Sequence, residues 1–163
     1  MAKHSNKDEM GRAQLGAWGE LLVQQELLTF NIDSARMTTD YGIDLVAYDP
    51  ASKQSFSIQV KTRSPRLRDT RYSWGVLPGK CNDADLLAFA IKDRPEDHWY
   101  LTPQQFKKLA IRRKGLLVLR FATQGSSKRV KSISELNQFK GRMPGLANFL
   151  AHFRQSGAIA ASA

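Results

Sequence analysis

A predicted β-hairpin constrains the fold of this chain more than any other feature of the sequence. Its first strand, 43–48, carries Asp44 within an otherwise apolar run. Its second strand, 56–62, alternates, so that the apolar residues share one face and Gln59 and Lys61 share the other. The intervening Asp-Pro-Ala-Ser-Lys sequence is typical of a turn. Such a hairpin would place a carboxylate, an amide and an ammonium group close together.

Length and composition indicate one globular domain. The 163 residues suffice for one core but not for two ordinary domains, and 42% hydrophobic with 25% charged residues is globular composition. We expect a core over residues 8–105 and a basic C-terminal extension over 106–155. The polar residues 1–7 and the small residues 156–163 are expected to be disordered.

The sequence argues against export and against a membrane span. The longest apolar run, 86–91, is far shorter than the roughly 18 residues that a span requires. The N-terminus lacks a hydrophobic signal segment, and the single cysteine, Cys81, excludes an internal disulfide. We therefore expect a cytoplasmic protein with no membrane association and no small-molecule cofactor.

The positive charge is concentrated in the C-terminal part of the chain. The formal net charge is +10. Residues 1–97 hold 13 Lys/Arg against 14 Asp/Glu, whereas 98–163 hold 12 Lys/Arg against one acid, Glu135. This asymmetry favours a polyanionic partner. A solvated basic face, or a ribosome-type binder without chemistry, would explain the charge equally well.

Periodicity predicts an N-terminal helix over 8–29. Within it, Glu20 shares a stripe with Val23 and Leu27, whereas Glu26 projects elsewhere and is interpreted as solvated. If this helix packs across the sheet, Glu20 can reach a water bound to a metal. The alternative for Glu20 is a salt bridge to an arginine.

The hairpin side chains suit a hard cation such as Mg²⁺, which prefers oxygen ligands. The predicted ligands are the Asp44 carboxylate, the Gln59 amide oxygen and the Val60 carbonyl. Lys61 is placed to orient an attacking water or to offset charge on a phosphate. The alternative is an ordinary polar strand face, in which Gln59 binds no metal.

Asp44, the Gln-x-Lys triplet at 59–61 and a glutamate in a preceding helix resemble the PD-(D/E)xK nuclease superfamily in its Q-x-K variant. Similar patterns occur in Mrr-like restriction endonucleases, intron-encoded endonucleases and Holliday junction resolvases. The resemblance covers about 8–105. It implies an α/β, restriction-endonuclease-like αβββαβ core with a mixed sheet, to which the chain adds a basic C-terminal helical extension.

The resemblance also implies a function. The expected activity is metal-dependent hydrolysis of DNA phosphodiester bonds, with Mg²⁺ as cofactor and Mn²⁺ as a substitute. A homodimer is expected from the resemblance alone, because cutting both strands calls for two sites. The implied catalytic residues are Glu20, Asp44, Gln59 and Lys61. A non-catalytic DNA-binding module, which the uncharged Gln59 would suit, and an RNA-binding protein are the alternatives.

Two basic segments, 62–82 and a helix expected over 104–114, are predicted to contact nucleic acid through phosphate contacts and base stacking. Trp74 is either a stacking residue or an anchor in the core. Together with a third basic stretch near 128–131, these segments supply the predicted contacts: Arg63, Arg66, Arg68, Arg71, Tyr72, Lys107, Lys108, Arg112, Arg113, Lys114, Lys128, Arg129 and Lys131.

Overall fold

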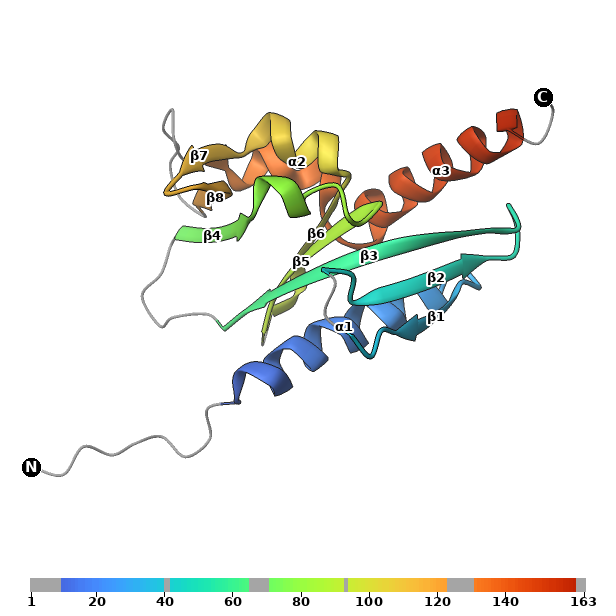
Figure 1. Ribbon diagram of the computed structural model, residues 1–163, viewed down its shortest axis with the longest axis horizontal. Coiled ribbons are helices and arrows are strands. Elements are labelled where there is room, and N and C mark those ends of the chain that lie inside the picture. The colour runs from blue at the N-terminus through green and yellow to red at the C-terminus, as the bar shows by residue number, and fades with distance from the viewer. Residues whose placement is uncertain (1–9, 40–41, 65–70, 93, 123–130, 161–163) are drawn as a thin grey trace, which may run out of the picture.

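The computed structural model describes residues 10–39, 42–64, 71–92, 94–122 and 131–160. Within these ranges the chain forms two β-sheets with helices around them (Figure 1). The helices are α1 (Arg12–Leu28), α2 (Pro103–Leu109) and α3 (Ala147–Ala160), with short helical segments at η1 (Pro78–Lys80), η2 (Ile133–Phe139) and η3 (Gly141–Leu146).

The larger sheet, here sheet A, has the strand order β1-β2-β3-β5-β6. Its strands are β1 (Asp33–Arg36), β2 (Leu45–Asp49), β3 (Gln54–Arg63), β5 (Leu86–Ile91) and β6 (Arg94–Leu101). β2 and β3 form the predicted antiparallel hairpin, with Leu45 opposite Ile58, and β3 runs parallel to β5. The sheet is therefore mixed, as the sequence predicts.

The smaller sheet, here sheet B, has the order β4-β8-β7, and β9 also pairs with β8. Its strands are β4 (Arg71–Val76), β7 (Ile111–Arg113), β8 (Leu116–Ala122) and β9 (Lys131–Ser132). Segment 62–82, which we expected to be a basic loop, thus contains a strand. Tyr72, Trp74 and Val76 are all buried on one face of β4, and this alternation is the strand signal.

The basic helix expected over 104–114 is too long. Helix α2 ends at Leu109, and Ile111–Arg113 pair with β8. The reason is a two-residue turn at Lys114 and Gly115, whose φ angles of 49° and 77° match the mirror-image turns that close β-hairpins. At its N-terminus α2 does carry the predicted cap, because Thr102 Oγ1 accepts a hydrogen bond from Gln105 N (3.2 Å).

Two apolar cores lie on the two faces of sheet A. On one face, α1 and α3 cover Leu45, Phe56 and Ile58. On the other face, sheet B and α2 cover Leu87 and Phe89. Helix α1 approaches β3 closely at Gly19, where any Cβ would collide with Thr62 Oγ1. This close approach of α1 to β3 explains why residue 19 is a glycine.

The described part of 106–155 belongs to both cores. Phe106, Leu119 and Leu136 pack with sheet B, while Leu146 and Leu150 pack with α1 and β3. The segment forms the helical stretches η2, η3 and α3 after residue 132, as expected for a helical extension, but it also supplies strands β7, β8 and β9. It therefore completes the fold.

Buried polar groups connect the elements. The carboxylate of Asp49 on β2 accepts two hydrogen bonds from Arg154 of α3, at 2.8 and 3.0 Å. Glu26, which we expected to be solvated, instead accepts a hydrogen bond from Tyr100 (2.6 Å) and pairs with His98 Nε2 (2.9 Å). Burial, with the Glu26 carboxylate beside it, raises the pKa of Tyr100 well above its ordinary value. None of the described helices is long and apolar enough to cross a membrane.

Candidate active site

Asp44 lies directly before β2 and is fixed by the strands on both sides. Its backbone N–H donates to Ile58 O (2.9 Å), and its carbonyl accepts from Met37 N (2.9 Å). Its side chain turns to the backbone of β3, where Oδ2 accepts a hydrogen bond from Val60 N (2.6 Å). The carboxylate therefore lies at the position between Gln59 and Lys61. The other oxygen, Oδ1, takes no part in this bond.

Gln59 lies deeper in the structure than the hairpin pattern alone predicts. The residue is only 4% exposed, because sheet B and α2 cover its face of sheet A. Its Nε2 donates to Gly42 O (2.8 Å), while its Oε1 is buried without a hydrogen-bond partner in the described structure. A buried acceptor left unpaired costs about 1–3 kcal/mol. The amide oxygen is thus suited to a cation or a donor from outside the chain.

Lys61 lies two residues further along β3 and therefore on the same face as Gln59. It is partly exposed, and Phe89 is its partner across the β3–β5 pairing. Among the described residues, none forms a hydrogen bond or an ion pair with its Nζ. The ammonium group is therefore available to an anionic ligand. Arg63, at the end of β3, is exposed and lies on this face as well.

Glu20 forms an ion pair with Arg36 of β1 (Nε to Oε2, 2.5 Å). This is the salt bridge to an arginine that was the alternative for Glu20. Arg36 pairs with Leu45, the residue after Asp44, so the ion pair lies at the Asp44 end of the β1–β2 ladder. The structure brings the Asp44 carboxylate into contact with the backbone of Val60, the residue between Gln59 and Lys61 on β3. The Glu20 carboxylate is paired with Arg36, and the described structure gives it no contact with Asp44, Gln59 or Lys61.

The donor set at this position fits a hard cation. The Asp44 carboxylate and the unpaired Gln59 Oε1 are both oxygen ligands, of the kind that Mg²⁺ and Mn²⁺ take. In the portion of the chain that the structure describes, three or more His, Cys, Asp or Glu side chains never gather around a common cation position. Any cation held here would therefore depend on the neutral amide and on backbone oxygen. Val60, which donates its N–H to Asp44, stays a predicted ligand through its carbonyl.

Tyr72 is the one predicted nucleic-acid contact that the structure contradicts. Its side chain is 5% exposed and packs in the aromatic core, with ring centroids 6.2 Å from Trp74 and 5.3 Å from Phe121. It cannot stack on a base from there, so this prediction is wrong. Trp74 is 2% exposed and is likewise a core residue.

The predicted cationic contacts fall into three groups. Four of them, Arg66, Arg68, Lys128 and Arg129, lie outside the described residues, as does the side chain of Arg71. Lys131 pairs with Glu135 (3.1 Å). The remaining members beyond β3 are all exposed and follow one another through α2 and the β7–β8 turn: Lys107, Lys108, Arg112, Arg113 and Lys114. We call these five residues the basic ridge.

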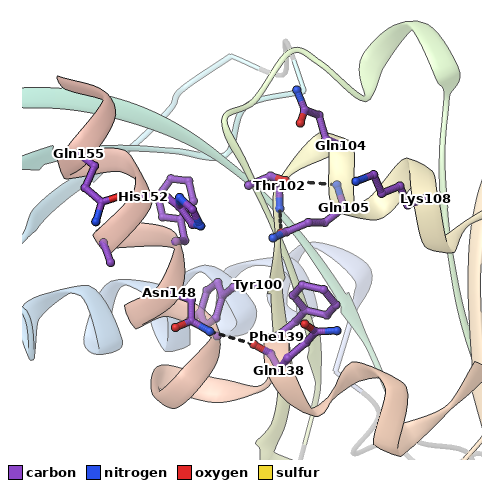
Figure 2. Close-up of a pocket in the computed structure, with 13 residues that line it drawn as sticks. Tyr100, Thr102, Gln104, Gln105, Lys108, Gln138, Phe139, Asn148, His152 and Gln155 are labelled. Carbon is purple, nitrogen blue, oxygen red and sulfur yellow. Dashed lines mark hydrogen bonds between the residues drawn. The ribbon is translucent and has the colours of Figure 1, made fainter. Parts of the chain in front are cut away.

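A cavity of about 630 Å³ lies away from the hairpin, between α2, α3 and the end of β6 (Figure 2). Its walls carry side-chain amides from α2 and α3, together with Tyr100, Phe139 and His152. Of the predicted site residues only Lys108 lines it. Asp44, Gln59 and Lys61 therefore do not line this cavity.

The sequence did not predict that Lys80 and Asp83 lie near Gln59. A Cβ placed on Gly42 would lie 3.3 Å from Gln59 Nε2, 3.6 Å from Asp83 Oδ2 and 3.7 Å from Lys80 Cδ. Lys80 is the last residue of η1, Asp83 lies between η1 and β5, and the two side chains form an ion pair (3.6 Å). The only signal in the sequence was the acidic start of the strand at 83–85.

The αβββ unit and the parallel β3–β5 pair define a restriction-endonuclease-like fold, with Asp44 directly before β2 and the Gln-x-Lys triplet on the adjacent strand β3. A solved bacterial homing endonuclease, I-Ssp6803I, matches this chain with a TM-score of 0.63 over 94% of this chain and 99% of its own, at 13% identity. The predicted fold class is thereby confirmed. The match extends well beyond 8–105, so the C-terminal part of the chain shares the fold too.

A second solved structure gives a weaker overlap. The Holliday junction resolvase Hjc of Archaeoglobus fulgidus matches with a TM-score of 0.46, at 14% identity, over 64% of this chain and 82% of its own. Comparison of the sequence with known protein families gives no match, and neither does comparison with curated proteins.

Proposed function

We propose that this protein is a metal-dependent DNA endonuclease. The observation that carries the proposal is the contact of Asp44 with the backbone of Val60, which places a carboxylate between Gln59 and Lys61. The unpaired, buried Oε1 of Gln59 supports it, because that atom lacks a partner that a cation would provide. The fold of a homing endonuclease is consistent with it.

The proposed ligands are Asp44, Gln59 and the Val60 carbonyl, with Mg²⁺ or Mn²⁺ as the cation. A cation held there would lower the pKa of a bound water and offset charge on the phosphate. Water would add to phosphorus while one P–O ester bond breaks, which leaves a phosphate monoester and a free hydroxyl.

The protein groups have separate tasks in this proposal. Lys61 donates hydrogen bonds to the phosphate or to the attacking water, and it is not occupied by another described residue. Arg36 holds Glu20 at the Asp44 end of the β1–β2 ladder, where Glu20 would accept a hydrogen bond from a more distant water. The basic ridge and Arg63 would bind the phosphate backbone.

The test uses a supercoiled plasmid and a branched duplex, each with Mg²⁺ or Mn²⁺. We expect the wild type to cut at least one of them, and Asp44→Ala and Lys61→Met to lose at least about a hundredfold in rate. Lys53→Asn is the matched control, because it removes a lysine from the same hairpin and Asn tolerates the φ of 58° at that turn. Equal losses in the control and in Lys61→Met would contradict the role of Lys61.

A non-catalytic DNA-binding module is the second candidate, and the neutral Gln59 favours it. The lack of a negative charge at this position weakens cation binding. Tight DNA binding by a wild type that cuts neither substrate with either metal would establish this reading and refute the endonuclease. RNA binding is tested by a separate binding experiment, in which duplex DNA and RNA compete for the protein.

A further inference from the structure

We propose that Asp83 is a positioning residue of the metal site and supplies the negative charge that Gln59 lacks. This inference rests on the endonuclease proposal, since it concerns the same cation. It identifies a carboxylate that belongs neither to the hairpin nor to α1. Asp83 lies in the connection between η1 and β5, more than twenty positions after Lys61 in the sequence.

The first step is the position of Asp83 relative to Gln59. The backbone at Gly42 brings both side chains to one small volume, because Gln59 Nε2 and Asp83 Oδ2 lie 3.3 and 3.6 Å from the same point, the place of a Cβ on residue 42. Since glycine has no Cβ, nothing from residue 42 separates the carboxylate from the amide. Asp83 also remains partly accessible, with 34% of its side chain exposed.

The second step is the orientation of the amide. A glutamine side chain has two N–H donors on one end and an acceptor oxygen on the other, and its hydrogen bonds decide which end faces where. Here Nε2 donates to the Gly42 carbonyl at 2.8 Å, and the Asp83 carboxylate lies near the same point, the place of a Cβ on residue 42. The hydrogen bond to Gly42 keeps the N–H end on that side. The unpaired Oε1 is thereby the end that is left for a cation.

The third step is charge. With a neutral Gln59, Asp44 is the only formal charge among the three predicted ligands. A carboxylate just behind the amide polarises its N–H end, makes Oε1 a stronger ligand and adds a favourable field for the cation. Lys80 pairs with Asp83 at 3.6 Å, so its positive charge reduces the attraction of Asp83 for the cation. The pair is half exposed, so the Lys80 ammonium neutralises Asp83 only in part.

The experiment measures Mn²⁺ affinity by calorimetry in the full-length protein, without DNA. We expect Asp83→Asn to weaken Mn²⁺ binding about tenfold, because mutation of a residue that orients a metal ligand commonly costs that much affinity. The midpoint of urea unfolding should be unchanged. Glu96→Gln is the matched control, because it removes one exposed charge on β6, two strands away from β3, and should change affinity by less than about twofold.

A second readout separates direct proximity from a general charge effect. Gln59→Glu should bind Mn²⁺ more tightly than the wild type, because the ligand then carries its own negative charge. Adding Asp83→Asn to this variant should weaken Mn²⁺ binding by less than in the wild-type background, because no amide is left for Asp83 to orient. Lys80→Gln, with Asp83 in place, should raise Mn²⁺ affinity about threefold in the wild-type background. This variant keeps the test decisive even where Asp83→Asn fails to fold.

The outcomes separate the two proposals. Wild-type affinity in Asp83→Asn and in Lys80→Gln, with binding lost in Asp44→Ala, overturns the role of Asp83 and leaves the endonuclease proposal standing. Undiminished binding in Asp44→Ala overturns the metal site itself.

Discussion

Gly42 controls the surroundings of the Gln59 amide at the residue scale. Its φ of +83° is a conformation that glycine adopts without cost and that L side chains adopt only with strain. Its carbonyl accepts from Gln59 Nε2, and the space beside its Cα is shared by Gln59 and Asp83. One residue thus serves both the backbone turn before β2 and the orientation of the amide.

We therefore expect Gly42→Ala to have two separable effects. The positive φ should cost about 1–2 kcal/mol of stability, and the methyl group should displace the Gln59 amide and weaken Mn²⁺ binding. Gly115→Ala is the matched control, because Gly115 has a similar φ of +77° and no atom within 4 Å of its Cβ position. Urea unfolding should give similar losses for both variants. Calorimetry should find weaker Mn²⁺ binding in Gly42→Ala alone, and equal affinities would contradict a role for Gly42 in the site.

The sequence predicts the site through Asp44, Gln59 and Lys61, because strand alternation is a local property. It does not predict Asp83, whose approach to Gln59 depends on how the connection from η1 folds over Gly42. It also misassigned Tyr72, because arginines surround it in the sequence while its alternation with Trp74 and Val76 places it in the core. The arginines near Tyr72 in the sequence suggested a nucleic-acid contact, whereas the alternation of buried residues along β4 determines where its side chain lies.

At the element scale, helix α3 is attached to the hairpin through one buried carboxylate. Asp49 at the end of β2 is fully buried, and Arg154 donates two hydrogen bonds to it across the sheet face. The hydrogen bond from Arg154, with others from Ser52 and from the backbone of Ala51, holds the pKa of Asp49 below its usual value. Phe149 and Phe153 pack against Phe56 beside this pair, with centroids 5.1 and 4.9 Å apart.

Removal of Arg154 should therefore destabilise the protein in a pH-dependent way. Because the pKa of folded Asp49 is depressed, its contribution is present above the unfolded pKa of about 3.9 and is lost as pH falls through the folded value. We expect Arg154→Met to cost about 2 kcal/mol at pH 7, less than a fully buried pair because Arg154 is 37% exposed. The cost should shrink below about pH 4 as Asp49 is protonated.

Urea unfolding at pH 7 and pH 3 measures this difference. The surface pair Lys131–Glu135 supplies the control, since both side chains are more than a third exposed and Lys131→Met should leave the free energy of unfolding almost unchanged at both pH values. A penalty for Arg154→Met that is the same at both pH values would show that the helix, rather than the ion pair, had been damaged.

Element boundaries were predictable where a local signal marks them. The cap of Thr102 and Gln105 marks the start of α2, and the turn formers of 49–53 mark the hairpin. The end of α2 was missed, because the Lys114–Gly115 turn acts only when β8 is present to pair with 111–113. Strand β9 is likewise too short to have a periodic signal of its own.

At the scale of the whole molecule, the basic ridge lies on the side of sheet A that sheet B covers. The basic ridge runs through α2 and the β7–β8 turn, and sheet B joins it to the face of sheet A that carries Gln59 and Lys61. A duplex that reaches the site would therefore meet the ridge. The turn between β2 and β3, which carries Lys53, lies at the opposite end of the molecule (Figure 1).

DNA affinity should accordingly fall steeply with salt. If about six phosphates are contacted, the slope of log K against log salt concentration should be near −5. Replacing Lys107, Lys108, Arg112 and Arg113 with glutamine should make the slope shallower by about 3 to 4, whereas Lys53→Asn should leave it unchanged. Fluorescence anisotropy with a labelled duplex in a salt series gives both slopes. A salt-independent affinity would refute the polyanion interpretation of the charge.

The pairing of β4 with β8 has a consequence for the order in which the protein is made. β4 follows β3 directly, yet its partner strand comes only after β5, β6 and α2. While the chain emerges from the ribosome, Tyr72 and Trp74 must wait for residues 116–122, and the Gln59 face stays uncovered until then. The enclosed surroundings of the Gln59 amide therefore form only after residues 116–122 have been made, later than the strands that carry Gln59 and Lys61 themselves.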